Sequence, residues 1–482
     1  MRRRGRRRGP AQPERATGRR GGAALRRGDP QLRDPGGDEW RGELVRRRGL
    51  DPHDAGRVAL AGADGTRLRR RGRREGGRQA PVPAGGPAQQ IRGARRRNGG
   101  GLVRPAPRTF AHPAGLHNQT PRRVVFGPGS VAGLRDEVAR LGASRALVVT
   151  TPGRTEMGDR LAGDIGDACA GLLPEAVSQV PIELAHRGRD KADSMGADCL
   201  VAVGGGAATG LCKGIAYESG LPIIAVPTTY SGSEMTGYCG MTIDGVKRMH
   251  ESQSMRVSTV VYDAELSVGL PPAVSAASAL NALAHCIDVV PLSSVSPLIV
   301  PAALEGARVI TSTLPRLLAE PSSIWARNEM LYGAYLGGAA LTGGFALQHA
   351  VAHMLGGSFG VDHGIAHAVV LPYVTAVLVE RAPAPLARVA EAVGTDDLPG
   401  FVWDLVHDAG LPTTLREVGL DDADRARAIE ISVSADDHSN DAFLHPDTHD
   451  QNREGNPVPV RGDVVAEIID AAAAGSRPGA PS

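Results

Sequence analysis

The stretch CLVAVGGGAATGLCKG, residues 199–214, predicts how the folded part of this chain is built. It begins with a continuous apolar run, which is typical of a strand buried on both faces of a parallel sheet. Gly204, Gly205 and Gly206 follow and lead into a helix that carries Lys213. Such glycines let the backbone approach a pyrophosphate, and the helix N-terminus directs free N–H groups toward the anion. The stretch therefore predicts a nucleotide-binding turn with Lys213 as a phosphate contact, although a tight turn with a solvated lysine has the same pattern.

Further apolar runs alternate with helical patterns on both sides of this stretch. We interpret as strands the start of 122–142 and the runs ALVVTTP (146–152), AVSQVPIE (176–183), LPIIAVPTT (221–229) and STVVYDAELSVGLPP (258–272). Strands that alternate with helices form a parallel, doubly wound sheet with right-handed crossovers. We therefore expect an α/β, Rossmann-like dinucleotide-binding domain over residues 119–270. Pairing is expected to continue through GMTIDGVKR (240–248), where Asp244-Gly245 is a hairpin signal.

A second candidate loop for the nucleotide is VPTTYSGSEMT, residues 226–236. It follows a predicted strand with small hydroxyl residues, and we expect Thr228, Thr229 and Ser233 to contact the cofactor. A polar surface turn would look similar, but two such loops after neighbouring strands are what a dinucleotide needs. No acid ends the second strand, where Thr151 stands, so we expect NADPH to be accepted as well as NADH.

Beyond Pro271-Pro272 the pattern changes to helices. We expect them over residues 273–290, 301–312, 324–353 and 364–381, with a few more toward the C-terminus. Residues 271–482 are therefore predicted to form an all-α catalytic domain, and its cleft with the sheet domain is the expected place for cofactor and substrate to meet.

The predicted helical part contains QHAVAHMLGGSFGVDHGIAH, residues 348–367. Its histidines form two pairs spaced by four, so that each pair shares a helix face: His349 with His353, and His363 with His367. Gly356 and Gly357 are expected to break the helix, and Asp362 to cap the next one. A lone histidine on an apolar helix is usually structural, but four at these spacings favour a functional pocket. Asn281 and His285 are also four apart, within the run 275–290.

The first 118 residues differ sharply from the rest. They contain 30 Arg, no Lys and 10 acids, whereas the remaining 364 residues contain 25 basic and 42 acidic residues. An extension rich in Arg, Gly, Ala and Pro cannot bury enough apolar surface to offset the entropy of ordering, so we expect disorder. Its arginine runs would bind nucleic acid non-specifically. A translation start assigned too far upstream explains the same composition, and we favour that explanation over a nucleic-acid partner.

The compartment and solubility follow from the remaining composition. The five cysteines are scattered without a CxxC pair, and no apolar segment follows the basic start, which indicates reduced thiols in the cytoplasm. Residues 331–360 carry no Lys, Arg, Asp or Glu. They are rich in Gly and Ala and contain two histidines, so we expect a buried helical hairpin and not a membrane span.

Residues 122–471 resemble the iron-containing alcohol dehydrogenase superfamily and, within it, the maleylacetate reductases. The resemblance rests on GGGAATGLCKG, LPIIAVPTTYSGSEMT, DGVKR, LPPAVSAASALNALAHCID and HMLGGSFGVDHGIAHAVVLPY. It implies NADH- or NADPH-dependent reduction of 2-maleylacetate, a small dicarboxylate, to 3-oxoadipate during the degradation of aromatic compounds. It also suggests a homodimer.

The resemblance also assigns residue roles. The superfamily's alcohol dehydrogenases hold a divalent metal through one Asp and three His, which map to Asn281, His285, His349 and His363. Because the Asp is replaced by Asn, and Gly210 replaces an Asp of the glycine motif, the resemblance implies a metal-free enzyme. We expect His353 or His363 to donate the proton, and His285 and His349 to stabilise an enolate or bind a carboxylate. Asn281 and Lys247 are predicted substrate contacts.

Two alternatives remain open at this point. One is a metal-dependent alcohol or hydroxyacid dehydrogenase that uses iron or zinc. The other is a nucleic-acid-binding protein with an inactive enzyme core. Ala207, where the family's glycine motif usually has Ser, and Gln348, where the reductases often have His, are departures that would also fit reduced activity.

Overall fold

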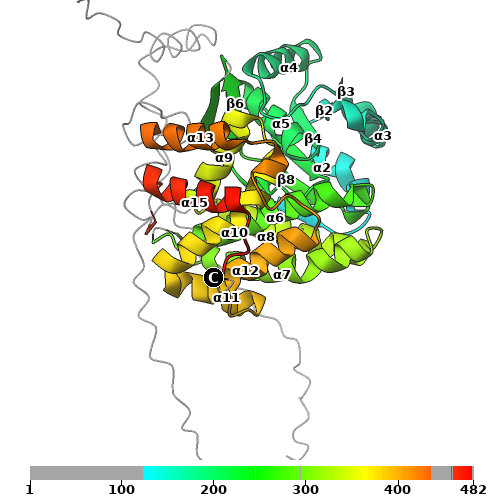
Figure 1. The fold of residues 1–482 in the computed structure, drawn as a ribbon. Coiled ribbons are helices and arrows are strands. Elements are labelled where there is room, and N and C mark those ends of the chain that lie inside the picture. The colour runs from blue at the N-terminus through cyan, green and yellow to red at the C-terminus, as the bar shows by residue number, and fades with distance from the viewer. Residues whose placement is uncertain (1–122, 245, 294, 436–456, 459, 480–482) are drawn as a thin grey trace, which may run out of the picture. The chain divides into compact units, whose positions relative to one another are not determined.

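A computed structural model describes residues 123–479, apart from 245, 294, 436–456 and 459. Six parallel strands form the main sheet in the order β1-β8-β5-β4-β2-β3. Figure 1 labels β2, β3, β4 and β8 of this sheet. Their bounds are β1 Arg123–Phe126, β2 Ala146–Val149, β3 Cys169–Leu173, β4 Cys199–Gly204, β5 Ile223–Pro227 and β8 Thr259–Tyr262. The predicted parallel sheet, followed by helices, is confirmed, whereas the predicted extension 1–118 lies outside the described residues.

The central strands are apolar throughout because helices cover both faces of the sheet. In β4, Cys199, Val201 and Val203 pack in one core with helices α2 (Leu134–Arg140) and α3 (Thr155–Ile165). Leu200 and Ala202 point the other way, into the core that contains α4 (Ile182–Ser194) and α5 (Gly206–Ser219). Successive side chains of a strand point to opposite faces, so two buried faces produce an uninterrupted apolar run.

Two predictions about strands need correction. Residues 176–183 are not a strand, because Gln179 and Val180 have φ values of 65° and 33° and α4 begins at Ile182. The third strand is β3, which lies earlier in the chain at the edge of the sheet. The hairpin at Asp244 exists, but its strands β6 (Tyr238–Ile243) and β7 (Val246–Glu251) form a separate antiparallel pair.

Helices occupy the chain after β8. They are α6 Pro272–Val289, α7 Ile299–Ala319, α8 Ile324–Leu341, α9 Leu347–Phe359, α10 His363–Arg381, α11 Pro383–Val393, α12 Leu398–Asp408, α13 Asp422–Ala435 and α15 Gly462–Ala474. Helix α10 lies among them and contacts α6, α9, α12 and α15. Among the described residues it is the one helix long and apolar enough to cross a membrane, but most of it is buried inside the protein. A domain boundary near residue 270 remains a prediction.

The helix breaks fall at other glycines than predicted. The predicted helix 324–353 is two helices, because α8 ends at Leu341 and α9 begins at Leu347. Gly344, with φ of 127°, lies in the connection. Gly356 and Gly357 lie inside α9, which ends at Phe359 and is followed by Gly360, its C-cap residue, in the left-handed conformation. Asp362 caps α10 as predicted, because its carboxylate accepts hydrogen bonds from the backbone N–H groups of Gly364 and Ile365.

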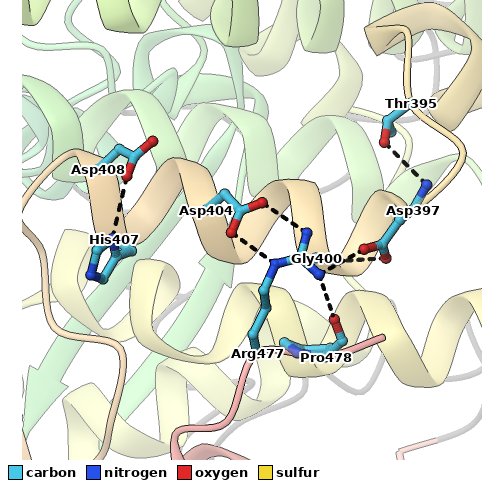
Figure 2. A network of polar contacts seen from close by, with 8 residues as sticks. All are labelled: Thr395, Asp397, Gly400, Asp404, His407, Asp408, Arg477 and Pro478. Atoms are coloured by element: carbon cyan, nitrogen blue, oxygen red, sulfur yellow. Dashed lines mark hydrogen bonds and ion pairs between the residues drawn. The ribbon is translucent and has the colours of Figure 1, made fainter. Parts of the chain in front are cut away.

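The segment after α15 is fastened to α12 by Arg477 (Figure 2). Its guanidinium donates two hydrogen bonds of 2.8 Å to Asp404 and one of 2.9 Å to Asp397, the N-cap residue of α12. The guanidinium lies close over Gly400, where a Cβ atom would be 2.4 Å from Arg477 Nη1, so a larger residue there would make the Arg477 side chain shift. Bidentate pairing of this kind holds the end of the described chain in one geometry.

Candidate active site

A cavity of about 580 Å³ lies where the sheet meets the helices. Its walls come from the loops after β4 and β5 and from helices α6, α9 and α10. The two loops lie side by side because Gly204 pairs with Pro227 at the carboxyl ends of neighbouring parallel strands. The backbone N–H of Thr228 then donates to Gly204 O at 3.0 Å. The structure thus brings together the two loops that the sequence predicted for a nucleotide.

The glycine turn leaves room for a ligand and for no side chain of its own. Gly204 has φ of 146°, and a Cβ atom on Gly205 would lie 2.7 Å from Thr229 Oγ1. Helix α5 begins at Gly206, so its first N–H groups lie at the turn, where a helix N-terminus attracts anions. Gly204, Gly205, Gly206, Thr228, Thr229 and Ser233 all line the cavity. These features fit the pyrophosphate of a nicotinamide dinucleotide.

Lys213 does not contact the cavity, and the predicted phosphate contact is wrong. The side chain is fully buried, and Nζ donates to Ser233 O at 2.6 Å, Tyr238 O at 2.8 Å and Thr236 Oγ1 at 3.2 Å. A lysine has three N–H donors, and all three are used here. Burial lowers the pKa of Lys213 to about 8. Its role is to hold the loop 231–238 against α5.

The loop after β5 also packs directly on helix α8. A Cβ atom on Gly338 would lie 2.8 Å from Gly232 O, and one on Gly232 would lie 2.9 Å from Gly338 Cα. Backbone therefore touches backbone at this point. Behind the loop, the buried Glu234 accepts a 2.6 Å hydrogen bond from the hydroxyl of Tyr262 on β8. The loop is thus held from the sheet and from the helices at once.

Five imidazoles gather beside this loop. Neighbouring ring centroids are 4.7 to 6.4 Å apart, for example 5.1 Å between His285 and His349, 5.5 Å between His353 and His363 and 4.7 Å between His363 and His367. The four predicted histidines line the cavity, together with Asn281. His367 is the fifth ring and lies fully buried behind them. Because α9 and α10 are antiparallel neighbours joined by a short turn, both histidine pairs reach one cluster.

Asp288 on α6 orients His349. Its carboxylate is fully buried and accepts a 2.7 Å hydrogen bond from His349 Nδ1. The same carboxylate accepts backbone N–H bonds from Ala346 at 2.9 Å and Gln348 at 3.0 Å, at the start of α9. Because Nδ1 of His349 donates its hydrogen to Asp288, Nε2 is the ring nitrogen that remains available to a ligand. Nε2 has no hydrogen-bond partner among the described residues.

Two of the five imidazoles are held neutral. Burial lowers the pKa of His285 and of His367 well below the ordinary value, and neighbouring histidines lower both further. Neither ring therefore carries the extra proton that a general acid transfers at neutral pH, although each keeps one N–H that can donate a hydrogen bond. His353 and His363 are half-buried and line the cavity, so they keep a route to water.

This neutrality predicts acid sensitivity. Below about pH 6.5 the unfolded chain binds protons at His285 and His367 that the folded protein does not, so stability is complete above that pH and is lost as the pH falls. Each group is expected to contribute a slope of about 1.4 kcal/mol per pH unit. Chemical denaturation between about pH 7.5 and 5.5 measures it. His367→Gln should reduce the slope, whereas a variant of the exposed His407 should not; equal slopes in all three proteins would contradict the assignment.

The family's metal site does not fit this chain. Asn281 offers a neutral amide in place of a carboxylate, and its Nδ2 donates to Ser231 O at 3.4 Å. His285, His349 and His363 are not a group whose ligand atoms come together. Among the described residues, the group with all ligand atoms within 4.8 Å is His353, His363 and His367. These three could bind a divalent cation, but they are not the residues that the resemblance assigns to one.

Most predicted site residues therefore meet in one cavity, with two exceptions. Lys213 lies outside it. Lys247 pairs with Thr242 in the β6–β7 hairpin, and its side chain lies outside the described residues. Sequence reasoning missed Asp288 and left His367 out of the site. Asp288 was detectable, because it is the one Asp, Glu, Lys or Arg between Glu265 and Glu305.

Comparison with known proteins agrees with this architecture. Residues 121–264 match the iron-containing alcohol dehydrogenase family, and residues 275–473 match the C-terminal part of that family. The chain belongs to the iron-containing alcohol dehydrogenase family. Maleylacetate reductase of Burkholderia cepacia is 39% identical over 357 residues, which are 74% of this chain and 97% of that protein. Maleylacetate reductase of Rhizobium sp. strain MTP-10005 is 35% identical over 75% of this chain and 99% of its own length.

Solved structures give the same result. The crystal structure of maleylacetate reductase from Agrobacterium tumefaciens is similar with a TM-score of 0.68 and 35% identity. The alignment covers 76% of this chain and 99% of that one. The similarity thus extends over nearly the whole of that enzyme.

Proposed function

We propose that this chain is a maleylacetate reductase, which uses a reduced nicotinamide nucleotide to convert 2-maleylacetate to 3-oxoadipate in the degradation of aromatic compounds. The observation that carries the proposal is the single cavity in which the glycine turn after β4 faces a cluster of imidazoles from α6, α9 and α10. Relatives of that name match over nearly their whole length and support it.

The reaction needs a place for negative charge. The bound nucleotide supplies a hydride to one carbon of the substrate's carbon–carbon double bond, and the π electrons move onto the conjugated carbonyl oxygen. Positioned donors around that oxygen stabilise the enolate. We assign this role to His285 and His349. Both rings line the cavity, and the buried carboxylate of Asp288 holds the ring of His349 in one orientation.

The enolate then takes a proton on carbon. An imidazole that water can reach can serve as the general acid. We assign the transfer to His353 or His363, which line the cavity and are half-buried, so that water can return the proton afterwards. Phe345 packs on His349 and His353, with centroid distances of 5.2 and 6.1 Å, and keeps this side of the cavity apolar. Asn281 and Lys247 remain proposed substrate contacts.

A chelator experiment tests the chemistry directly. Oxidation of NADH and of NADPH is followed by absorbance with 2-maleylacetate, before and after treatment with EDTA. We expect kcat to stay within about twofold, because donors from the chain replace a Lewis acid. Metal analysis of the same preparation is the control. A stoichiometric metal whose removal abolishes turnover would instead support the alternative hypothesis of a metal-dependent alcohol dehydrogenase.

We further propose that the nucleotide is NADH or NADPH, and that the chain is a cytoplasmic homodimer. The five cysteines are free thiols, which fits a reducing compartment. The dimer rests on the resemblance alone, and light scattering of the purified chain would contradict it by giving the mass of one chain.

A further inference from the structure

The cationic side chain of Arg154 lines the cavity close to the carboxyl end of β2. β2 is hydrogen-bonded to β4 with Val149 opposite Ala202, so Thr151 is level with Gly204 of the glycine turn. After Thr151 the chain makes one short 3-10 turn to Arg154, and α3 begins at the next residue. Thr151 and Arg154 line the same cavity as the glycine turn. The pairing of β2 with β4 therefore places Arg154 beside the nucleotide-binding loops, at the carboxyl ends of the strands.

In the described part of the chain, no ion pair neutralises the charge of Arg154. Among the described residues that line the cavity, Arg154 is the one Lys or Arg, and Asp362, on the α10 side, is the one carboxylate. Other arginines of this domain do have partners, since Arg135 on α2 pairs with Asp167 and Arg189 on α4 pairs with Glu218.

The surroundings of Arg154 are suited to a phosphate monoester. A guanidinium binds phosphate oxygens through two parallel N–H bonds. Hydroxyl groups of Thr151 and Ser178, which also line this end of the cavity, add donors. In nucleotide-binding sheets of this kind, an acid after the second strand binds the ribose 2′-hydroxyl, whereas an arginine accommodates a 2′-phosphate. Here Thr151 and Arg154 line the cavity after β2, whereas the one nearby acid, Glu156 on the first turn of α3, is not among the described residues that line it.

We propose that Thr151, Arg154 and Ser178 form a binding site for the 2′-phosphate of NADPH, so that this chain prefers NADPH to NADH. The proposal rests on the proposed function in so far as a nicotinamide nucleotide occupies the cavity. It makes Arg154 the residue that discriminates between the two nucleotides, and it places the adenosine end of the cofactor at β2, away from the imidazole cluster.

Nucleotide binding without substrate tests the site. Dissociation constants for NADPH and NADH are measured by titration calorimetry on the full chain and on three variants: Arg154→Gln, Arg154→Lys and Arg160→Gln. The last changes an exposed arginine of α3 and serves as the matched control. We expect Arg154→Gln to weaken NADPH about tenfold to a hundredfold and NADH less than about twofold. Arg154→Lys should retain part of the preference, because a lysine keeps the charge and loses the fork.

Other outcomes would overturn the proposal. Equal loss for both nucleotides would place Arg154 on the pyrophosphate. An unchanged nucleotide affinity with a raised KM for maleylacetate would place it on a substrate carboxylate. A wild-type chain that binds NADH more tightly would also refute the preference. Failure of the proposed function is distinguishable, because tight binding of NADPH without maleylacetate turnover would leave the 2′-phosphate site standing and remove the reductase assignment.

Discussion

Replacing His353 or His363 with alanine is expected to lower kcat by about a hundredfold or more, the usual loss when a general acid is removed. These two rings line the cavity and remain half-buried, whereas His285 and His367 are buried and held neutral. The measurement is kcat for maleylacetate at saturating nucleotide. Nucleotide affinity, measured separately, should change little, because the histidines lie on helices and not on the glycine turn.

His407→Ala is the control for this pair of variants. His407 is exposed at the end of α12, so its loss removes an imidazole without touching the cavity. If both His353→Ala and His363→Ala keep kcat within about twofold of the wild-type value, neither ring is the proton donor and general acid catalysis lies elsewhere. A large effect at one position alone identifies the donor between the two.

Asp288→Asn is expected to damage stability and rate together. The carboxylate accepts hydrogen bonds from three backbone N–H groups and from His349 Nδ1, all buried. An amide of the same size turns an N–H group toward at least one of these donors. Leaving a buried donor unpaired costs about 1–3 kcal/mol in free energy of unfolding. Loss of a residue that orients a functional imidazole lowers kcat by about tenfold to a hundredfold.

The two effects of Asp288→Asn can be separated. Urea denaturation gives the free energy of unfolding, and kcat is measured on the fraction that remains folded. Asp408→Asn is the matched control, because Asp408 also contacts a histidine, His407, at 3.3 Å but does so at the surface. A folded Asp288→Asn protein with wild-type kcat would show that the orientation of His349 is immaterial.

The sheet was predictable wherever strands are buried on both faces. In the sequence, such strands are continuous apolar runs. These runs predicted β2, β4, β5 and β8. β3 was missed because it is an edge strand, mostly half-buried, so its residues carry no such pattern. A nearby apolar run at 176–183 took its place in the prediction. Whether that run forms a turn or a strand depends on its packing against α4 and the β6–β7 hairpin. The sequence pattern contains no information on that packing.

The site was predictable in its residue types and less so in their contacts. Histidine spacing indicated the cluster, because i, i+4 pairs share a helix face whatever the tertiary structure. The role of Lys213 was not accessible in the same way. A lysine on the first turns of a helix after a glycine turn suits a phosphate equally well, and only the position of the loop 231–238 shows that all three of its donors are already occupied. Asp288 reaches His349 across 61 positions of sequence.

The contact between Gly232 and Gly338 sets a limit on how this enzyme can evolve. Neither glycine takes part in the chemistry. A methyl group on either one, however, would have to enter space that the main chain of the other already fills. Substitution there would displace the loop after β5, whose Ser231 and Ser233 line the cavity, and a shift of about 1 Å in an active site is enough to cost much of the rate. Tolerance at these two sites is governed by volume, so even the small change from Gly to Ala is expected to be disruptive.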